Sequence, residues 1–416
     1  MLLPYANDRR NTVFPAVTCS FIAANIIVYL CLYPFGPDFI ADNFGFSPSH
    51  VSVMYVVTSM FVHVSPIHLL WNMFFLWLFG PNVEDALGHA GFAAIYLIGG
   101  FVAAMFHSII AVNFMPAYVD WPVIGASGAI AGVLGIFAVR FYRTGIRVLS
   151  IFGPLTIPAK YGLGIWFLQQ VLGGLFCVAA TVLSPASPLS DWGHRIFSDG
   201  VAYWAHIGGM GFGMIMAFLL NMGRTGTKEY LLDDARASLE DGVTWHAAEH
   251  MRAVLERDPK DADVHANLAR TYALQGDTDL AVAHYQKCVE LFLKKKDYEK
   301  AASSFIELRA FDEGASIPLH SEFQIARRLD EDNRHEYAIE LFKEIASSHP
   351  GTPEAEMSLV RAGTLCLHKA HDPSEAVVCY ELFLDQYPHS SWCTLVTKSL
   401  AEARKRIKDS GEAGSE

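Results

Sequence analysis

Residues 123–139, VIGASGAIAGVLGIFAV, are the stretch that decides the fold of this chain. The run is uncharged and apolar, and Gly128, Gly132 and Gly135 recur at the spacing of one helix face, which is typical of helices that pack closely within a lipid bilayer. One serine, Ser127, lies near its start. Since such a serine usually bonds its own backbone or a neighbouring helix, a functional role for it needs support from elsewhere in the chain.

Five further apolar runs accompany this one. The six runs cover 14–33, 67–80, 91–112, 123–139, 161–183 and 200–221. The second and fourth are short for helices that cross lipid alone, but helices buried among others can be short. The sequence therefore predicts an all-α fold in which a six-helix polytopic membrane bundle precedes a soluble helical region.

Charge divides the chain in the same way. Before Arg224 there are 7 Lys and Arg and 8 Asp and Glu, and from Arg224 onward there are 24 and 35. An acidic soluble half argues against nucleic acid, which needs a basic surface. The seven cysteines contain no C-x-x-C pair, which favours reduced thiols and a cytoplasmic location for that half. The N-terminal segment lacks the pattern of a cleavable signal.

The placement of Lys and Arg predicts the orientation of the spans. With the N-terminus inside, the outer loops carry only Arg195. The inner segments carry eight basic residues: Arg9, Arg10, Arg140, Arg143, Arg147, Lys160, Arg224 and Lys228. This asymmetry puts the N-terminus and the C-terminal half in the cytoplasm.

In this orientation the second, fourth and sixth spans all run from outside to inside. His68 and Asn72 lie near the start of the second, Ser127 near the start of the fourth and His206 near the start of the sixth. We expect each about five residues into its helix, roughly 7 Å deep. Polar groups in lipid are costly and tend to mark function, so their shared depth predicts one site.

Ser127 and His206 are the candidate catalytic pair. A serine hydroxyl needs a base within hydrogen-bond reach to act as a nucleophile. His206 begins the segment HIGGMGFG, in which Gly209 and Gly213 lie on its helix face, and a glycine face would let this helix approach the glycines after Ser127. Because the outer spans offer no obvious acidic third member, the sequence predicts a dyad.

His68 and Asn72 are the candidate oxyanion donors. They are four residues apart and so lie on one helix face, and the Ser127 amide is a third donor. In the alternative interpretation His63, His68 and His206 bind zinc, but the chain has no H-E-x-x-H motif. We predict no metal and no cofactor.

The C-terminal half shows a repeat of about 34 residues. Small and large residues recur in one phase in four places: Ala247, Met251 and Pro259; Ala281, Tyr285 and Leu293; Ala338, Phe342 and Pro350; and Ala376, Tyr380 and Pro388. The first two sets and the intervening Leu268, Ala269, Tyr272 and Gly276 fit the tetratricopeptide pattern. The alternative is a helical bundle with coincidental repeats. The predicted domains are 1–223 in the membrane, 224–405 as a repeat solenoid and 406–416 as a disordered tail.

Three segments together resemble the signature motifs of the rhomboid intramembrane serine proteases. They are HVSPIHLLWNMFFLWLFG at 63–80, GASG at 125–128 and AHIGGMGFG at 205–213, and the resemblance covers about residues 10–222. It implies Ser127 as the nucleophile, His206 as the general base, and His68, Asn72 and the Ser127 amide as oxyanion donors. The glycines expected to pack near the site are Gly125, Gly128, Gly132, Gly209 and Gly213. Glu84 matches a structural acidic position.

Two features depart from the family pattern. Many members carry an aromatic residue four positions after the serine, which packs on the catalytic histidine, and Ala131 stands there in this chain. Many members also have a Trp-Arg pair in the first outer loop, which residues 34–66 lack. Another residue must therefore hold His206.

The expected function is cleavage of transmembrane protein substrates near their outer ends, with the repeats binding a cytoplasmic protein or peptide. The expected location is a cell membrane, and the compact six-span form would suit a bacterial plasma membrane. The alternatives are a catalytically inactive relative that binds transmembrane clients as an adaptor, and a membrane-anchored scaffold in which the repeats are the working part.

Overall fold

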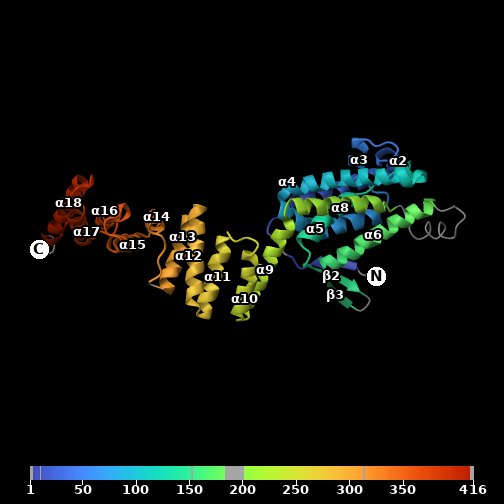
Figure 1. Ribbon diagram of the computed structural model, residues 1–416. Coiled ribbons are helices and arrows are strands. Elements are labelled where there is room, and N and C mark those ends of the chain that lie inside the picture. Colours follow the sequence, from blue (N-terminus) through green and yellow to red (C-terminus); the bar gives the residue numbers. More distant parts are fainter. Residues whose placement is uncertain (1–2, 10, 151–152, 183–200, 313, 413–416) are drawn as a thin grey trace. The chain divides into compact units, whose positions relative to one another are not determined.

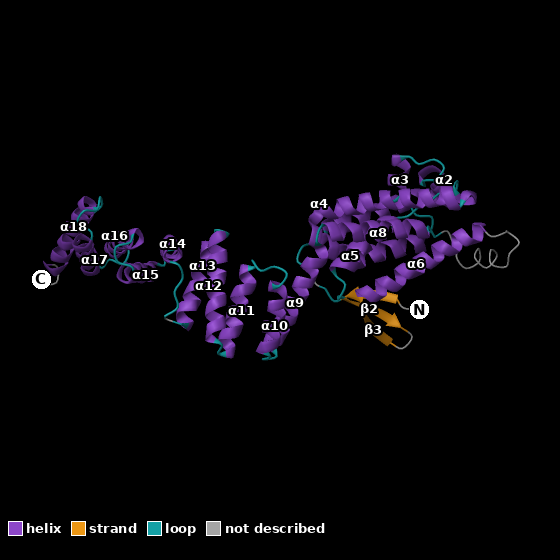
Figure 2. Ribbon diagram, viewed as in Figure 1, coloured by secondary structure: helices purple, strands orange, loops and turns teal. Residues whose placement is uncertain are grey.

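The computed structural model describes the chain except for residues 1–2, 10, 151–152, 183–200, 313 and 413–416 (Figure 1). The chain forms two compact units, Met1–Tyr230 and Leu231–Glu416. Helices dominate both units (Figure 2), so the predicted all-α fold class is confirmed.

The helices of the first unit follow the apolar runs. Its elements are β1 (Leu3–Asn7), α1 (Ala16–Leu32), η1 (Tyr33–Phe35), α2 (Pro37–Phe44), α3 (Val53–Ser59), α4 (Pro66–Phe114), η2 (Pro116–Tyr118), α5 (Ser127–Arg140), β2 (Gly145–Ser150), β3 (Gly153–Pro158), α6 (Ala159–Val182), α8 (Tyr203–Leu219) and α9 (Met222–Glu240), the last of which continues into the second unit.

Three described helices, α1, α4 and α6, are long and apolar enough to cross a membrane, and α8 with the bent α9 would make a fourth. The second and third predicted runs both lie in α4, which is interrupted at Gly88 by a left-handed backbone with φ 71°. The 14 residues of α5 are apolar but shorter than a full span.

The three site-bearing helices begin later than the sequence suggests. Ser127 is the first residue of α5, His68 the third of α4 and His206 the fourth of α8, so the expected depth of about five residues is wrong. The chain before α5 cannot be helical, because Gly125 has φ +111° and Gly125 N–H donates to the Ser59 carbonyl oxygen. The site therefore lies at the helix ends.

The core of the first unit surrounds α5. Nearly all of its residues from Ala129 to Phe137 are buried, and α5 packs against α4 on one side and α8 on another. Its apolar character on every face is what a fully enclosed helix requires. Enclosure explains how so short a helix keeps its place in a membrane bundle.

Glycines allow α5 and α8 to approach each other closely. A Cβ atom built on Gly209 would clash with the Gly128 carbonyl oxygen, and one on Gly135 would clash with that of Met210. On the opposite side, a Cβ on Gly132 would lie 3.5 Å from the Gly99 Cα of α4. Backbone packs directly on backbone here, as small residues permit in membrane helices.

Glu84 holds the start of α1. Its carboxylate accepts from the Val17 amide at 2.8 Å, from the Thr18 amide at 2.7 Å and from the Thr18 hydroxyl at 2.6 Å. His89 contacts the same carboxylate at 2.5 Å. A negative group at a helix N-terminus satisfies free amides and the helix dipole, which gives Glu84 a structural role in joining α1 to α4.

A three-stranded antiparallel sheet, in the order β1-β2-β3, was not expected from the sequence. Leu3 pairs with Leu149, and Gly145 pairs with Pro158. The sheet joins the N-terminal segment to the connection between α5 and α6. Hydropathy gives a weak signal for such short strands.

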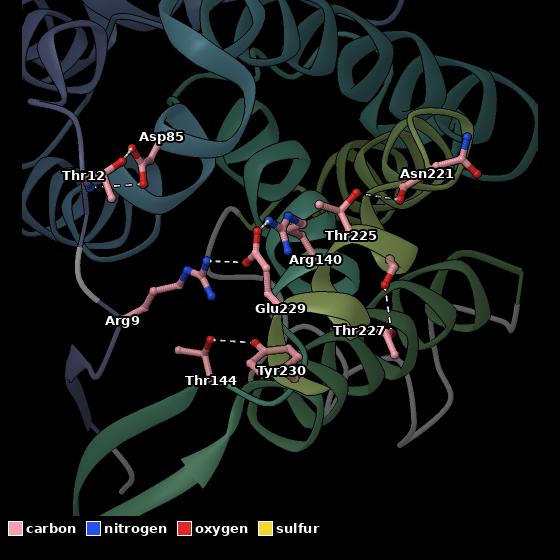
Figure 3. A network of polar contacts seen from close by, with 11 residues as sticks. Arg9, Thr12, Asp85, Arg140, Thr144, Asn221, Thr225, Thr227, Glu229 and Tyr230 are labelled. Carbon is pink, nitrogen blue, oxygen red and sulfur yellow. Dashed lines mark hydrogen bonds and ion pairs between the residues drawn. The ribbon is translucent and has the colours of Figure 1, made fainter. Parts of the chain in front are cut away.

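Two arginines of this end share one carboxylate with α9 (Figure 3). Glu229 accepts from Arg9 at 2.7 Å and from Arg140 at 2.5 Å. One residue further, the Tyr230 hydroxyl lies 3.0 Å from that of Thr144. The buried Arg140 is the last residue of α5, so this network lies at the opposite end of α5 from Ser127, about 20 Å away at the helical rise.

The second unit is a series of antiparallel helices. They are α10 (Thr244–Leu255), α11 (Ala262–Gln275), α12 (Thr278–Lys294), α13 (Tyr298–Phe311), α14 (Leu319–Glu331), α15 (His335–Ser348), α16 (Pro353–His368), α17 (Pro373–Gln386) and α18 (Cys393–Glu412). The aspartates Asp261, Asp277 and Asp297 cap α11, α12 and α13 through their side chains. Each helix packs mainly on its sequence neighbours, as in helical solenoids.

The small and aromatic residues that define the predicted repeat are buried. Ala281 and Tyr285 in α12 and Ala376 and Tyr380 in α17 are all less than 5% exposed. The predicted tail at 406–416 is wrong in part, because α18 continues to Glu412. Its Ala, Glu, Arg and Lys residues favour helix. Residues 413–416 lie outside the described part of the chain.

Candidate active site

Ser127 and His206 meet at the start of α5 and α8. The Ser127 Oγ lies 2.8 Å from the His206 Nε2, a normal hydrogen-bond distance. Both side chains are partly accessible, so neither is sealed in the core. The close α5–α8 packing brings together two residues that are 79 positions apart.

Gln170 of α6 is the second partner of His206, and it was missed in the sequence. Its Oε1 lies 2.8 Å from His206 Nδ1. A carboxamide oxygen can only accept, so Nδ1 carries a hydrogen and Nε2 of the neutral ring is left to accept from Ser127. A signal existed: Gln169 and Gln170 are a polar pair inside the fifth apolar run, and polar residues in lipid mark candidate sites.

Trp166, one turn before Gln170 on α6, packs on the same histidine. Its ring centroid lies 5.8 Å from that of His206, with 30° between the planes. Ala131, which stands where the family's aromatic residue was expected, is fully buried in α5. In this chain α6 therefore supplies the aromatic contact that α5 lacks.

His68 and Asn72 adjoin the loop that leads into Ser127. A Cβ atom built on Gly125 would lie 2.8 Å from the His68 Nε2 and 3.4 Å from the Asn72 Nδ2. The absence of a side chain at Gly125 thus leaves room for both donors. The start of α5 also leaves its first amides, including that of Ser127, without partners inside the helix. Three kinds of donor converge beside the nucleophile candidate.

His63 belongs to this group as well, although the sequence placed it only before the helix. It is 1% exposed, its Nε2 accepts from Asn72 Nδ2 at 2.9 Å, and its ring meets that of His68 edge to face at 5.0 Å. One amide hydrogen of Asn72 is held by His63, which directs the carboxamide. In the zinc alternative His206 would be a ligand, but Ser127 and Gln170 occupy both of its ring nitrogens.

Family comparison agrees with this geometry. Residues 50–223 match the family model described as rhomboid domain, and residues 250–283 match that described as tetratricopeptide repeat. The first range contains Ser127, His206 and all the residues around them named above. The second contains the first predicted repeat.

Several curated relatives are similar in sequence. Presenilin-associated rhomboid-like protein A, mitochondrial, of Danio rerio is 29% identical over 46% of this chain and 45% of its own length. The human mitochondrial relative is 36% identical over 36% and 37% of the two chains. Rhomboid protease GluP of Bacillus subtilis is 24% identical over 70% and 56%. The chain spans less than half the length of the mitochondrial relatives, which do not support the bacterial plasma membrane suggested by the sequence.

Solved repeat proteins are similar to part of the chain. The MamA protein is 16% identical, with a TM-score of 0.22 over 39% of this chain and 92% of its own. A Pseudomonas aeruginosa protein described as pilF is 19% identical, with a TM-score of 0.23 over 46% and 90%. Taken with the two family matches and the apolar helices, the chain is a multi-pass membrane protein of the rhomboid family that carries C-terminal tetratricopeptide-like repeats.

Proposed function

We propose that this protein is an intramembrane serine endopeptidase. The observation that carries the proposal is the 2.8 Å contact between Ser127 Oγ and His206 Nε2, with the histidine tautomer set by Gln170. A hydroxyl beside an oriented base is the minimum arrangement for acyl transfer by serine. The rhomboid domain and its relative GluP, printed as a protease, support this activity.

The reaction follows from the roles of the site residues. His206 Nε2 takes the Ser127 hydroxyl proton as Oγ bonds to the scissile carbonyl carbon, and the carbonyl oxygen becomes an oxyanion. Donors from His68, Asn72 and the Ser127 amide would stabilise that charge. His206 then gives its proton to the leaving amine as the peptide bond breaks. Water, activated by the same base, releases the acyl group and restores Ser127.

The proposed cleavage position is near the outer end of the substrate. Ser127 lies at one end of α5, and Arg140 lies at the other beside Arg9 and Glu229. Arg147 lies in the sheet attached to that second end. Basic residues gather on the cytoplasmic side of membrane proteins, so the site faces outward. Arg195 and Arg10, which entered the sequence argument, lie outside the described residues.

Transmembrane segments that unwind readily are the proposed substrates. A helical peptide bond is shielded by its own hydrogen bonding, so a substrate must open locally before attack. Glycine lowers helix stability by about 1 kcal/mol relative to alanine, and we expect substrates with Gly or Ser near the cut to be preferred. Equal cleavage after replacing these residues with Leu would contradict this preference.

The repeat unit is proposed to bind a protein or peptide in the cytoplasm. Helical repeats usually present an extended surface to partners. Deletion of residues 231–416 is expected to leave cleavage of a model single-span substrate intact while removing partner capture. If the deletion abolishes cleavage in a folded membrane unit, the repeats are part of the protease and the scaffold alternative has to be reconsidered.

The decisive experiment measures proteolysis of a model single-span substrate in proteoliposomes, with fluorophosphonate labelling as the second readout. We expect the wild type to cut and to label, Ser127→Ala to do neither, and His206→Ala not to cut. A folded wild type that neither cuts nor labels would favour the inactive client-binding alternative, in which Ser127→Ala leaves function unchanged.

A further inference from the structure

Gln170 is 5% exposed and bonds the ring nitrogen of His206 that faces away from Ser127. We infer that Gln170 is the positioning residue of the catalytic unit, so that the pair is completed by a neutral amide and functions as a Ser127–His206–Gln170 relay. The inference rests on the proposed protease function. The sequence searched only for an acidic third member, whereas an amide oxygen offers the same acceptor geometry.

The contact fixes which nitrogen of His206 is the base. A neutral imidazole has one N–H and one lone pair, and without a partner at Nδ1 the hydrogen could reside on either nitrogen. Since Gln170 Oε1 can only accept, it favours the Nδ1–H form and leaves the lone pair of Nε2 toward Ser127. The hydrogen bond to Gln170 persists when His206 takes the serine proton, because Nδ1–H remains a donor in the imidazolium.

Gln170 and Trp166 hold the ring from the same helix. Trp166 tilts over His206 at 5.8 Å between centroids, which limits ring rotation, while Gln170 limits the direction of Nδ1–H. An amide differs from a carboxylate because it brings no charge into a desolvated site. The titratable groups that act on His206 are His68 and His107 of α4, both histidines, so a charge introduced at position 170 should be readily detected in the pH profile.

The chain supplies its own control for this inference. Gln169 is the adjacent residue on α6 and is exposed, whereas Gln170 is buried. Gln169→Leu and Gln170→Leu make the same chemical change in the same helix turn. Only the second removes the acceptor at His206 Nδ1. Gln170→Glu restores an acceptor oxygen of similar reach.

The test compares full-length wild type and these three variants in proteoliposomes. For Gln170→Leu we expect kcat to fall about tenfold to hundredfold, the effect of losing one buried orienting hydrogen bond, with KM within about twofold of wild type. Gln169→Leu should match wild type. Gln170→Glu should recover most activity at high pH and move the acidic limb of the pH–rate profile upward by about one unit, because a nearby anion favours imidazolium.

A spectroscopic readout separates this inference from the protease proposal. ¹⁵N NMR of histidine-labelled protein, with His206 assigned by the signal lost in His206→Ala, should show a protonated Nδ1 and an unprotonated Nε2 in wild type and a mixture of tautomers in Gln170→Leu. A wild type that shows this tautomer but does not cut would sink the protease proposal alone. Equal kcat for the two leucine variants, or the same tautomer in both, would overturn the role of Gln170.

Discussion

A Cβ atom built on Gly213 of α8 would overlap the carbonyl oxygen of Gly132 in α5. The two helices that carry His206 and Ser127 therefore touch through backbone atoms two turns below the site. No side-chain rotation can relieve a clash with a carbonyl, so a larger residue at either position must push the helices apart. The Ser127–His206 distance depends on this contact.

Gly213→Ala is expected to destabilise the membrane unit by about 1–3 kcal/mol, the usual cost of overpacking a core, and to abolish most cleavage. The matched control is Gly211→Ala on the same helix, where an added Cβ meets nothing within 4 Å. Alanine favours helix over glycine, so this control should keep full activity. Thermal unfolding in detergent and proteolysis in proteoliposomes give both readouts, and similar losses in the two variants would contradict the packing argument.

Gly125→Ala should lower activity about a hundredfold, the typical effect of losing an oxyanion donor. Its φ of +111° is unfavourable for a side chain, and the new Cβ would lie 2.7 Å from the His68 ring and displace it. Gly36→Ala is the control, since Gly36 has φ +84° with nothing within 4 Å. It carries a backbone cost of about 1–2 kcal/mol without touching the site. Equal kcat for the two variants would show that His68 has no part in the reaction.

Glu84→Gln should lower the free energy of unfolding of the membrane unit by about 1.5–3 kcal/mol, the range for hydrogen bonds to a charged group. The charged carboxylate serves three donors at the start of α1, and an amide can satisfy fewer of them. Asp85→Asn is the comparison: Asp85 accepts from Thr12 and Val13 at the exposed side of the same helix start. It should cost less than about 1 kcal/mol. Thermal unfolding in detergent ranks the pair, and an equal loss would contradict the dominant role of Glu84.

Glu322→Gln should stabilise α14 at neutral pH. Burial raises the pKa of the Glu322 carboxyl, and Glu344 adds to the shift. A carboxyl whose pKa is raised in the folded state favours the native state below the ordinary glutamate pKa and loses that contribution as the pH rises through the raised value. At pH 7 the buried anion is therefore unfavourable, whereas glutamine keeps an oxygen for the Ile317 amide.

Hydrogen exchange of α14 amides in the full-length protein tests this. Protection should rise in Glu322→Gln at pH 7, and the gain over wild type should shrink as the pH falls toward the ordinary glutamate value. Glu336→Gln, on the exposed side of α15, removes the same charge without the burial. A gain that is equal in the two variants would assign the effect to net charge.

Much of the architecture could be predicted from the sequence because it is encoded locally. Long apolar runs specify membrane helices through the cost of unsatisfied backbone groups in lipid, and small residues at helical spacing specify close packing, as at Gly128 and Gly209. The repeat phase of Ala281 and Tyr285 specified their burial in the same way. The antiparallel sheet was missed because its strands are short and pair across about 140 residues.

The sequence by itself determined the helical class, the division into a membrane unit and a repeat unit, and the candidate pair Ser127 and His206. Only the tertiary structure decided what holds that pair. Gln170, Trp166 and His63 reach the site from three separate stretches of the chain, and periodicity shows only that a residue faces inward. Which inward residues meet is set by helix packing and by the break at Gly125, because a hydrogen bond between distant residues requires their helices to be placed to within a fraction of an ångström.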